Sequence, residues 1–315
     1  MAESLIDPTS SKRQVIPLLF LSVSMVSSAS ILILFSSSHP FVIVFWRTFY
    51  GSIFMATIGI ARGDFKKLRQ MITRENWFWL AAIGITLSLH FCTWFQSLFM
   101  TTVAASVVLV DSSPIFTAIL STLFLGEALR RRSWVGILIA LIGAVFLAWG
   151  DFGGSGIVAL AGDLLALSGA LFLALYFIGG RRIAKEMPIT VYTATIYLIA
   201  ALTTVPICMT FNLNILVFEP TEVVIFLALA IFPTVLGHSV NNYLLTKVPA
   251  YVVSSAVLGE PIGAAILAAL IFAQIPGITT VVGFIVILFG IALVLADIAA
   301  HERAERLPLD DTDRS

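Results

Sequence analysis

Residues 103–124 read VAASVVLVDSSPIFTAILSTLF, and residues 251–273 read YVVSSAVLGEPIGAAILAALIFA. Each stretch is long enough to cross a bilayer as a helix, because a hydrocarbon core about 30 Å thick takes roughly 20 mostly apolar residues. Each also carries an acidic residue shortly before a proline: Asp111 precedes Pro114, and Glu260 precedes Pro261. Two such segments in one chain indicate a membrane protein built from related parts.

The two stretches belong to a repeat with an offset of 147 residues. Without a gap, this offset aligns three pairs of helix-shaping residues: Pro114 with Pro261, Gly136 with Gly283 and Gly143 with Gly290. Self-similarity at a fixed offset is typical of internally repeated architectures. We infer two related halves, residues 1–150 and 161–298, followed by a tail at 299–315.

The composition excludes a soluble protein. Of the 315 residues, 59% are hydrophobic and only 11% are charged, whereas a soluble domain carries roughly 25% charged residues. The mean hydropathy of +1.03 agrees. The chain therefore has too little charge to cover a water-exposed surface.

Ten apolar runs have the length of a membrane span. They lie at about 15–35, 41–61, 77–99, 103–124, 134–150, 161–179, 189–211, 222–243, 251–273 and 278–298. Unpaired backbone groups cannot face lipid, so these runs are predicted to be helices. The predicted fold is an all-α polytopic membrane protein with ten transmembrane helices. Five spans in each half is an odd number, so the second half is expected to be inverted relative to the first.

The basic residues predict the orientation. With the N-terminus in the cytoplasm, all 18 Lys and Arg residues except Arg47 fall in predicted inside segments. These are Lys12, Arg13, Arg62, Lys66, Lys67, Arg69, Arg74, Arg130, Arg131, Arg132, Arg181, Arg182, Lys185, Lys247, Arg303, Arg306 and Arg314. An excess of Lys and Arg marks the cytoplasmic side. We expect a multi-pass protein of the plasma or inner membrane with both termini cytoplasmic.

Three segments resemble a known transporter family. They are Phe45-Trp46-Arg47; Ser112-Ser113-Pro114 with Gly126-Glu127-Ala128-Leu129, Gly136 and Gly143; and Gly162-Asp163-Leu164-Leu165-Ala166-Leu167 with Tyr176 and Arg181-Arg182. In order and spacing, the chain is similar to the EamA-type branch of the drug/metabolite transporter superfamily. The second half departs from the pattern, since Ala273-Gln274 stands where the first half has Gly126-Glu127. The resemblance implies a ten-helix carrier of small metabolites, made of two five-helix repeats.

Five ionisable residues lie within the predicted spans: Arg47, His90, Asp111, His238 and Glu260. A charge at the bilayer centre costs about 2.5–3.5 kcal/mol on insertion scales, so such residues tend to face a cavity and to have a function. In transporters with inverted repeats, the substrate site lies near the midplane where the halves meet. We take these five residues as candidates for substrate binding or coupling.

Arg47 allows two interpretations. It can bind a substrate carboxylate or phosphate through its guanidinium fork, or it can form a structural ion pair with Asp111 or Glu260 or extend toward the headgroups. The two acids suit proton coupling or the binding of a cation. They are not equivalent in the repeat, because the offset pairs Asp111 with Leu258. Positions two apart on a helix point about 200° apart, so the sequence leaves open whether both acids face one cavity.

Each half also offers a histidine with a neighbour four residues later on the same helix face. His90 has Trp94, and His238 has Asn242. Histidine titrates near neutral pH, which suits a binding or coupling role. Hydrogen-bonded packing is the alternative for each of these histidines.

The glycine pairs Gly136/Gly143 and Gly283/Gly290 recur every seven residues. Small residues at such spacing allow close helix contact. That contact can lie inside the chain or across a homodimer, and the sequence does not choose.

Nothing in the sequence indicates an enzyme. HExxH, Gly-x-Ser-x-Gly and Walker-type motifs are absent from the sequence, and Cys92 and Cys208 have no metal-ligand spacing. We expect no cofactor, no metal and no nucleic-acid partner. The expected partners are a small-molecule substrate and the lipid bilayer.

The sequence favours a secondary transporter that moves a small polar or amphoteric metabolite, such as an amino acid, by alternating access. One arginine and two acids within the spans suit a ligand that bears both charges. A proton-coupled exporter of lipophilic cations is the alternative within transport, and a membrane-embedded enzyme is a distant one.

Overall fold

The computed structural model describes residues 14–71, 73–101, 103–127, 129–148, 156–272 and 278–306. In these ranges every regular element is a helix. The first half comprises α2 (Val15–Val26), α3 (Ala29–Phe35), α4 (Pro40–Arg62), the short η1 (Asp64–Lys67) and α5 (Leu68–Met71), α6 (Arg74–Ser97), α7 (Val103–Val110), α8 (Ser113–Leu120), η2 (Ser121–Leu125) and α9 (Arg131–Ala148). The second half comprises α10 (Ile157–Ile183), α11 (Ile189–Thr210), α12 (Pro220–Leu229), η4 (Ala230–His238), α13 (Ser239–Leu245), α14 (Ala250–Val257), α15 (Glu260–Phe272) and α16 (Ile278–Arg306).

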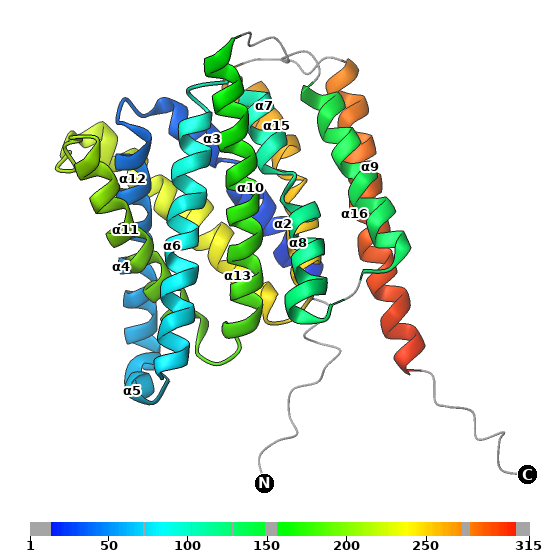
Figure 1. Cartoon of the computed structure of the whole chain (residues 1–315), viewed down its shortest axis with the longest axis horizontal. Coiled ribbons are helices and arrows are strands. Elements are labelled where there is room, and N and C mark those ends of the chain that lie inside the picture. Colours follow the sequence, from blue (N-terminus) through cyan, green and yellow to red (C-terminus); the bar gives the residue numbers. More distant parts are fainter. Residues whose placement is uncertain are drawn as a thin grey trace, which may run out of the picture.

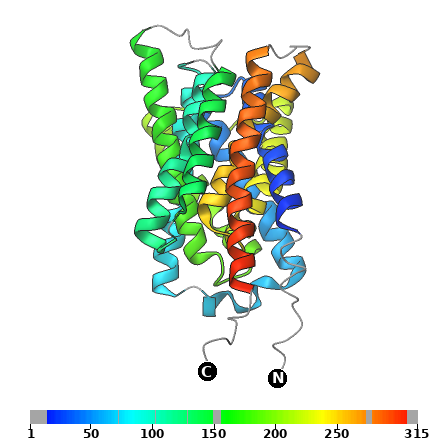
Figure 2. The ribbon, with the colours of Figure 1, turned by 90° about the vertical axis from the view of Figure 1, so that its right-hand side faces the viewer.

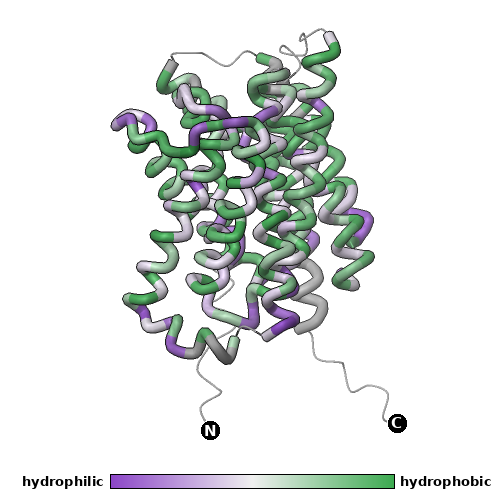
Figure 3. Tube along the Cα trace, turned by 60° about the vertical axis from the view of Figure 1, so that its left-hand side comes forward, coloured by the Kyte–Doolittle hydropathy of each residue, from purple (hydrophilic) through white to green (hydrophobic). Residues whose placement is uncertain are grey.

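The described residues of the ten predicted apolar runs lie mainly on these helices. Among the described residues, eight single or consecutive helices are long and apolar enough to cross a membrane, and Val281–Asp297 within α16 is a shorter apolar helix. Figure 3 shows the hydrophilic residues gathered toward the two ends of the molecule, with hydrophobic residues between them. The protein is a polytopic all-α membrane protein, as predicted.

The two ends of the molecule are named here by their segments. The terminal face carries α5, the link 184–188 and the end of α16, and the far face carries the links 36–39, 98–101 and 211–219 (Figures 1 and 2). Helix α9 runs away from the terminal face, whereas α16, at the equivalent place in the second half, returns to it (Figure 1). Equivalent helices therefore run in opposite directions, which confirms the prediction of inverted halves.

Three of the spans are broken in the middle. The breaks fall at Ser27–Ser28 between α2 and α3, at Asp111–Ser112 between α7 and α8, and at Leu258–Gly259 between α14 and α15. The last two are equivalent in the repeat, because α8 begins at Ser113 and α15 at Glu260, 147 residues apart. Each new helix has proline as its second residue. Proline has no N–H to donate and disfavours helical geometry in the residue before it, so the interruption falls at the same place in both halves.

The eighth predicted span is continuous, but its middle part is not a regular α-helix. Between α12 and α13, the nine residues of η4 form a π-helix that contains Pro233. A π-helical turn holds more residues than an α-helical turn, and such turns are frequent at functional sites.

Helices α9 and α16 form a closely packed pair at one side of the molecule (Figure 1). A β-carbon added to Gly136 would lie 2.7 Å from the carbonyl oxygen of Gly290, and one added to Gly143 would lie 3.0 Å from that of Gly283. The repeated glycines therefore allow a close contact inside the chain. Of the two possibilities that the sequence left open, this face of the two helices has internal packing.

The predicted tail is partly helical. Helix α16 runs to Arg306, eight residues beyond the predicted end of the span at 298. Residues 307–315 lie outside the described residues, as do Ala273 and Gln274, where the second half departs from the family pattern.

Replacing Gly290 by leucine is expected to destabilise the protein by about 1–3 kcal/mol or more, because the added atoms overpack a helix contact made through backbone. A β-carbon at this position would already lie 2.5 Å from the backbone nitrogen of Ala140. Thermal unfolding in detergent measures the effect. The matched control is Leu288→Phe, which adds bulk to a residue of α16 that is 56% exposed. Equal melting temperatures for the two variants would contradict the close contact.

Candidate functional site

A small cavity of about 20 Å³ lies where the helix breaks of the two halves meet. This volume accommodates about one water molecule. It is lined by Val26, Ala29, His90, Trp94, Val110, Asp111, Leu173, Phe177, His238, Asn241, Val257 and Glu260. The wall draws on both halves, and much of it comes from residues at or beside the three breaks.

Both intramembrane acids face this cavity. Asp111 is 1% exposed and lies in the break between α7 and α8, and Glu260 is 6% exposed and is the first residue of α15. One oxygen of each carboxyl group, Asp111 Oδ2 and Glu260 Oε1, has no hydrogen-bond partner among the described residues. The sequence left open whether the acids share a cavity. The structure brings them together because Asp111 lies outside regular helix, where the 200° argument does not apply.

The first break is tied to the third by a hydrogen bond. Ser27 Oγ donates to the backbone oxygen of Glu260 at 3.1 Å and also contacts the oxygen of Val23 at 2.7 Å. The contact links the α2–α3 break to the first turn of α15.

The two histidines line the cavity from opposite halves. His90 Nδ1 donates to the carbonyl oxygen of Gly169 at 2.9 Å, which fixes the orientation of the ring. The His90 ring stacks on Trp94, with centroids 5.9 Å apart and planes at 19°. His238 lies with its ring centroid 6.4 Å from that of His90, and its Nδ1 has no partner in the described part of the chain.

Asn242 does not line the cavity; the neighbouring Asn241 does. Asn242 Nδ2 instead donates a short hydrogen bond to the hydroxyl of Tyr176. The sequence interpretation paired His238 with Asn242 at i, i+4, whereas Asn241, at i, i+3 from His238, lines the cavity with it. The repeat offset of 147 residues could have identified Asn241 from the sequence, because it relates Trp94 to Asn241.

Arg47 lies beside the cavity but does not line it. The side chain is completely buried, and its Nε donates to Thr234 Oγ1 at 2.9 Å. Its guanidinium carbon lies 4.0 Å from the ring centroid of Phe91, a cation–π contact. No ion pair within 4.0 Å involves Arg47 in the described residues, although Glu260 interacts with it electrostatically. Its Nη1 and Nη2 have no hydrogen-bond partners there.

The site can therefore bind a small ligand with charged and polar groups. It offers two carboxyl groups, two histidines and an aromatic wall, with a buried guanidinium behind them. No group of three or more potential metal ligands occurs in the described residues. The elements that carry the site belong to both halves, so relative motion of the halves would change its access.

The comparison with protein families decides the class. The EamA-like transporter family matches the chain twice, over residues 14–149 and 160–296.

The chain belongs to the EamA-like transporter family.

This agrees with the sequence resemblance to the drug/metabolite transporter superfamily.

One further comparison concerns the sequence of this EamA-like transporter, and another concerns its fold. A Sinorhizobium sp. protein described as "Uncharacterized transporter in cobO 3'region" is 31% identical over 94 residues, which is 30% of this chain and 66% of the relative, slightly under two thirds of its length. A solved structure titled "Crystal structure of protein" is 20% identical, with a TM-score of 0.75 over 90% of this chain and 98% of that chain. At that identity the structure shows a shared fold.

Replacing Thr234 by valine is expected to destabilise this EamA-like transporter by about 1–3 kcal/mol, because a buried charged donor loses its acceptor. Thr234 Oγ1 accepts the hydrogen bond from Arg47 Nε. Thermal unfolding in detergent compares the melting temperature of this variant with that of the control, Thr57→Val. The control removes an exposed hydroxyl that donates to the carbonyl oxygen of Ile53 in its own helix. If both variants unfold at the wild-type temperature, Thr234 does not hold Arg47.

Proposed function

We propose that this transporter is a secondary carrier of small amphoteric metabolites of the amino-acid type, driven by a proton or substrate gradient. The observation that supports it is the placement of Asp111 and Glu260 on one cavity wall, with the buried Arg47 guanidinium behind it. The carboxyl groups attract the ammonium group of the ligand. Arg47 offsets their negative charge, so a ligand that also carries a carboxylate is tolerated.

The size of the cavity favours a small ligand. At about 20 Å³ it has to expand on opening even for a small amino acid, and it has to expand much further for a lipophilic cation. The alternative of a lipophilic-cation exporter is supported by the aromatic wall of Trp94 and Phe177 beside the two acids, because aromatic faces attract cations.

Proteoliposomes with the purified protein are expected to take up at least one of the twenty common L-amino acids faster than empty liposomes. Asp111→Asn and Glu260→Gln are expected to lower that uptake about 10-fold or more, because a hydrogen bond to a charged group is worth about 1.5–3 kcal/mol. Labelled amino acids and tetraphenylphosphonium are measured in parallel, with and without a pH gradient.

The matched control is Asp163→Asn. Asp163 is an acid of the sixth predicted span, in α10, that does not line the cavity, so this variant is expected to keep wild-type uptake. Uptake of tetraphenylphosphonium alone, dependent on Asp111 or Glu260, would replace the proposal with the cation exporter. If neither class moves faster than in empty liposomes, both substrate assignments fall.

Alternating access is supported by polar contacts that close the far face between the halves. The Glu222 carboxylate at the start of α12 accepts hydrogen bonds from Ser36 Oγ, from Ser37 N at 2.8 Å and Oγ at 3.0 Å, and from Ser38 Oγ at 2.6 Å. These three serines form the link between α3 and α4 of the first half. Opening the far face would break these bonds.

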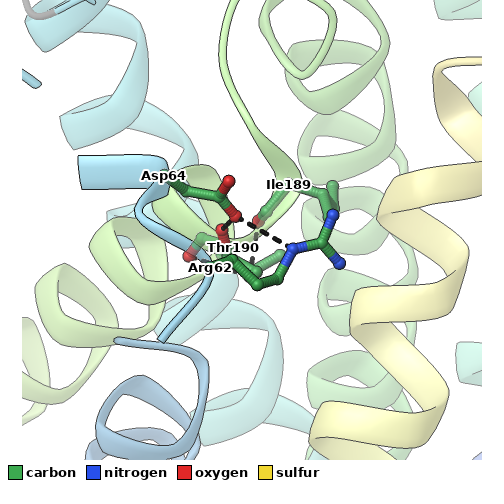
Figure 4. A network of polar contacts seen from close by, with 5 residues as sticks. Arg62, Asp64, Ile189 and Thr190 are labelled. Atoms are coloured by element: carbon green, nitrogen blue, oxygen red, sulfur yellow. Dashed lines mark hydrogen bonds and ion pairs between the residues drawn. The ribbon is translucent and has the colours of Figure 1, made fainter. Parts of the chain in front are cut away.

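Another set of contacts joins the halves at the terminal face. Glu127 Oε1 accepts from Arg181 Nε at 2.7 Å, and Glu127 Oε2 accepts from the backbone nitrogen of Ala250 at 3.3 Å. Asp64 accepts from Thr190 Oγ1 at 2.7 Å and pairs with Arg62 (Figure 4). These contacts at both faces support an occluded state in the proposed transport cycle.

The basic residues support an orientation for this cycle. Arg62, Arg74, Arg131, Arg182 and Lys247 lie at helix ends or links of the terminal face. Because basic residues are in excess on the cytoplasmic side of membrane proteins, the proposed orientation has the terminal face toward the cytoplasm. In this proposal the protein lies in the plasma or inner membrane with both termini cytoplasmic.

Replacing Glu222 by glutamine is expected to raise access to the cavity from the far face, because the amide loses the charge that strengthens these hydrogen bonds. The readout is the reaction of a cysteine introduced at Ala29, on the cavity wall, with a membrane-impermeant thiol reagent. The native Cys92 and Cys208 are replaced by alanine. The rate is expected to rise about 10-fold, the effect of about 1.4 kcal/mol.

The matched control is Glu219→Gln, three residues earlier. Glu219 is exposed and makes no side-chain capping bond at the start of α12, so its loss is expected to leave the rate unchanged. Equal rates for the Glu222 and Glu219 variants would show that the serine contacts do not close the far face.

A further inference from the structure

One indole and one amide at equivalent positions of the two halves reach the same cavity. The repeat offset relates Trp94 in α6 to Asn241 in α13, and both line the cavity. Trp94 is 3% exposed and Asn241 is 1% exposed. Trp94 Nε1, Asn241 Nδ2 and Asn241 Oδ1 have no hydrogen-bond partners in the described ranges.

Comparable groups elsewhere in the protein do have partners. Trp46 Nε1 donates to the carbonyl oxygen of Ile215 at 2.8 Å. Asn242, the next residue after Asn241, donates to the hydroxyl of Tyr176, although its Oδ1 has no partner among the described residues. Buried polar groups are as a rule hydrogen-bonded, and those that are not call for an explanation. Six of the twelve unpartnered side-chain atoms in the described residues belong to residues of the cavity wall.

The Trp94 donor is held in place by its surroundings. The Trp94 ring stacks on His90 with planes at 19°, and His90 is itself fixed by its hydrogen bond to Gly169. A group fixed in this way loses little further freedom when a ligand binds.

The acids of the same wall do not satisfy these donors. Asp111 Oδ2 and Glu260 Oε1 lie unpartnered on the same cavity as Trp94 Nε1 and Asn241 Nδ2. Donors and acceptors that face one space without pairing with each other are arranged to bind a ligand that carries both kinds of group. An amino acid has this composition, with an ammonium donor and a carboxylate acceptor.

We infer that Trp94 Nε1 and Asn241 Nδ2 form the subsite that donates hydrogen bonds to the carboxylate of the ligand, while Asp111 and Glu260 bind its ammonium group. This inference rests on the proposed function and names the direct contacts for the acidic end of the ligand. Arg47 acts from behind the wall through its charge, since it does not line the cavity. The two neutral donors bind the carboxylate without placing another charge in the membrane.

The inference is tested by selectivity between an amino acid and the amine left by its decarboxylation. The amino acid is the one that wild-type proteoliposomes take up fastest among the twenty common L-amino acids. Both compounds are measured as competitors of its labelled uptake. In Trp94→Phe and Asn241→Leu, the inhibition constant of the amino acid is expected to rise about 10- to 100-fold, the range for a hydrogen bond to a charged group. That of the amine is expected to change less than about threefold.

A second variant keeps the size of the side chain. Asn241→Asp replaces the donor by an acidic group. This variant is expected to weaken binding of the amino acid and to leave binding of the amine unchanged or stronger. The matched control is Trp77→Phe in the same helix, where the tryptophan is 50% exposed and does not line the cavity; it is expected to behave as wild type. Thermal unfolding in detergent confirms that each variant is folded.

The outcomes separate this inference from the proposed function. Suppose that the wild type takes up amino acids, and that the variants either weaken binding of both competitors equally or change binding of neither. The carboxylate subsite is then wrong, and the carrier assignment stands. If the wild type takes up none of the twenty amino acids, the proposed function and the subsite both fall.

Discussion

Carboxyl groups buried in a membrane have to be kept away from lipid, and the fold of this transporter depends on how that is done. Asp111 and Glu260 lie at helix breaks, 1% and 6% exposed, and turn toward one small cavity. A break is costly in hydrocarbon unless its freed backbone groups find partners. Ser27, in the α2–α3 break, contacts the backbone oxygen of Glu260 and so links this break to the start of α15. The breaks, the cavity and the acids therefore form one arrangement.

The repeat explains why the breaks meet. Equivalent prolines interrupt α7–α8 and α14–α15 at the same position, and the inverted orientation of the halves brings the two interruptions together from opposite directions. The contents of the two breaks differ, since Asp111 and Glu260 are not equivalent in the repeat. Symmetry thus provides the cavity, and departures from symmetry provide its chemistry. Trp94 and Asn241 illustrate the same point, because equivalent positions carry different donors on one wall.

Contacts between the halves lie at both faces, and their chemistry differs. At the far face a single carboxylate, Glu222, collects hydrogen bonds from three consecutive serines. At the terminal face, charged pairs and backbone contacts through Glu127 and Asp64 join the halves. By contrast, α9 and α16 meet through backbone at their glycines. Such a contact cannot be exchanged for another without separating the helices, so this pair is suited to act as a fixed unit while polar contacts at the faces change.

The sequence by itself determined the class, the spans, the inverted repeat and five ionisable residues of interest, because hydropathy, basic-residue bias and the proline spacing are properties of the chain. The structure places five of the seven candidate residues on one cavity: His90, Trp94, Asp111, His238 and Glu260. Only the tertiary structure decided that both acids share one cavity, that Arg47 stands behind the wall, and that Asn241 replaces Asn242. The reason is physical: helical periodicity predicts which face a side chain occupies only where the helix is regular, and this site is built from helix breaks and a π-helix.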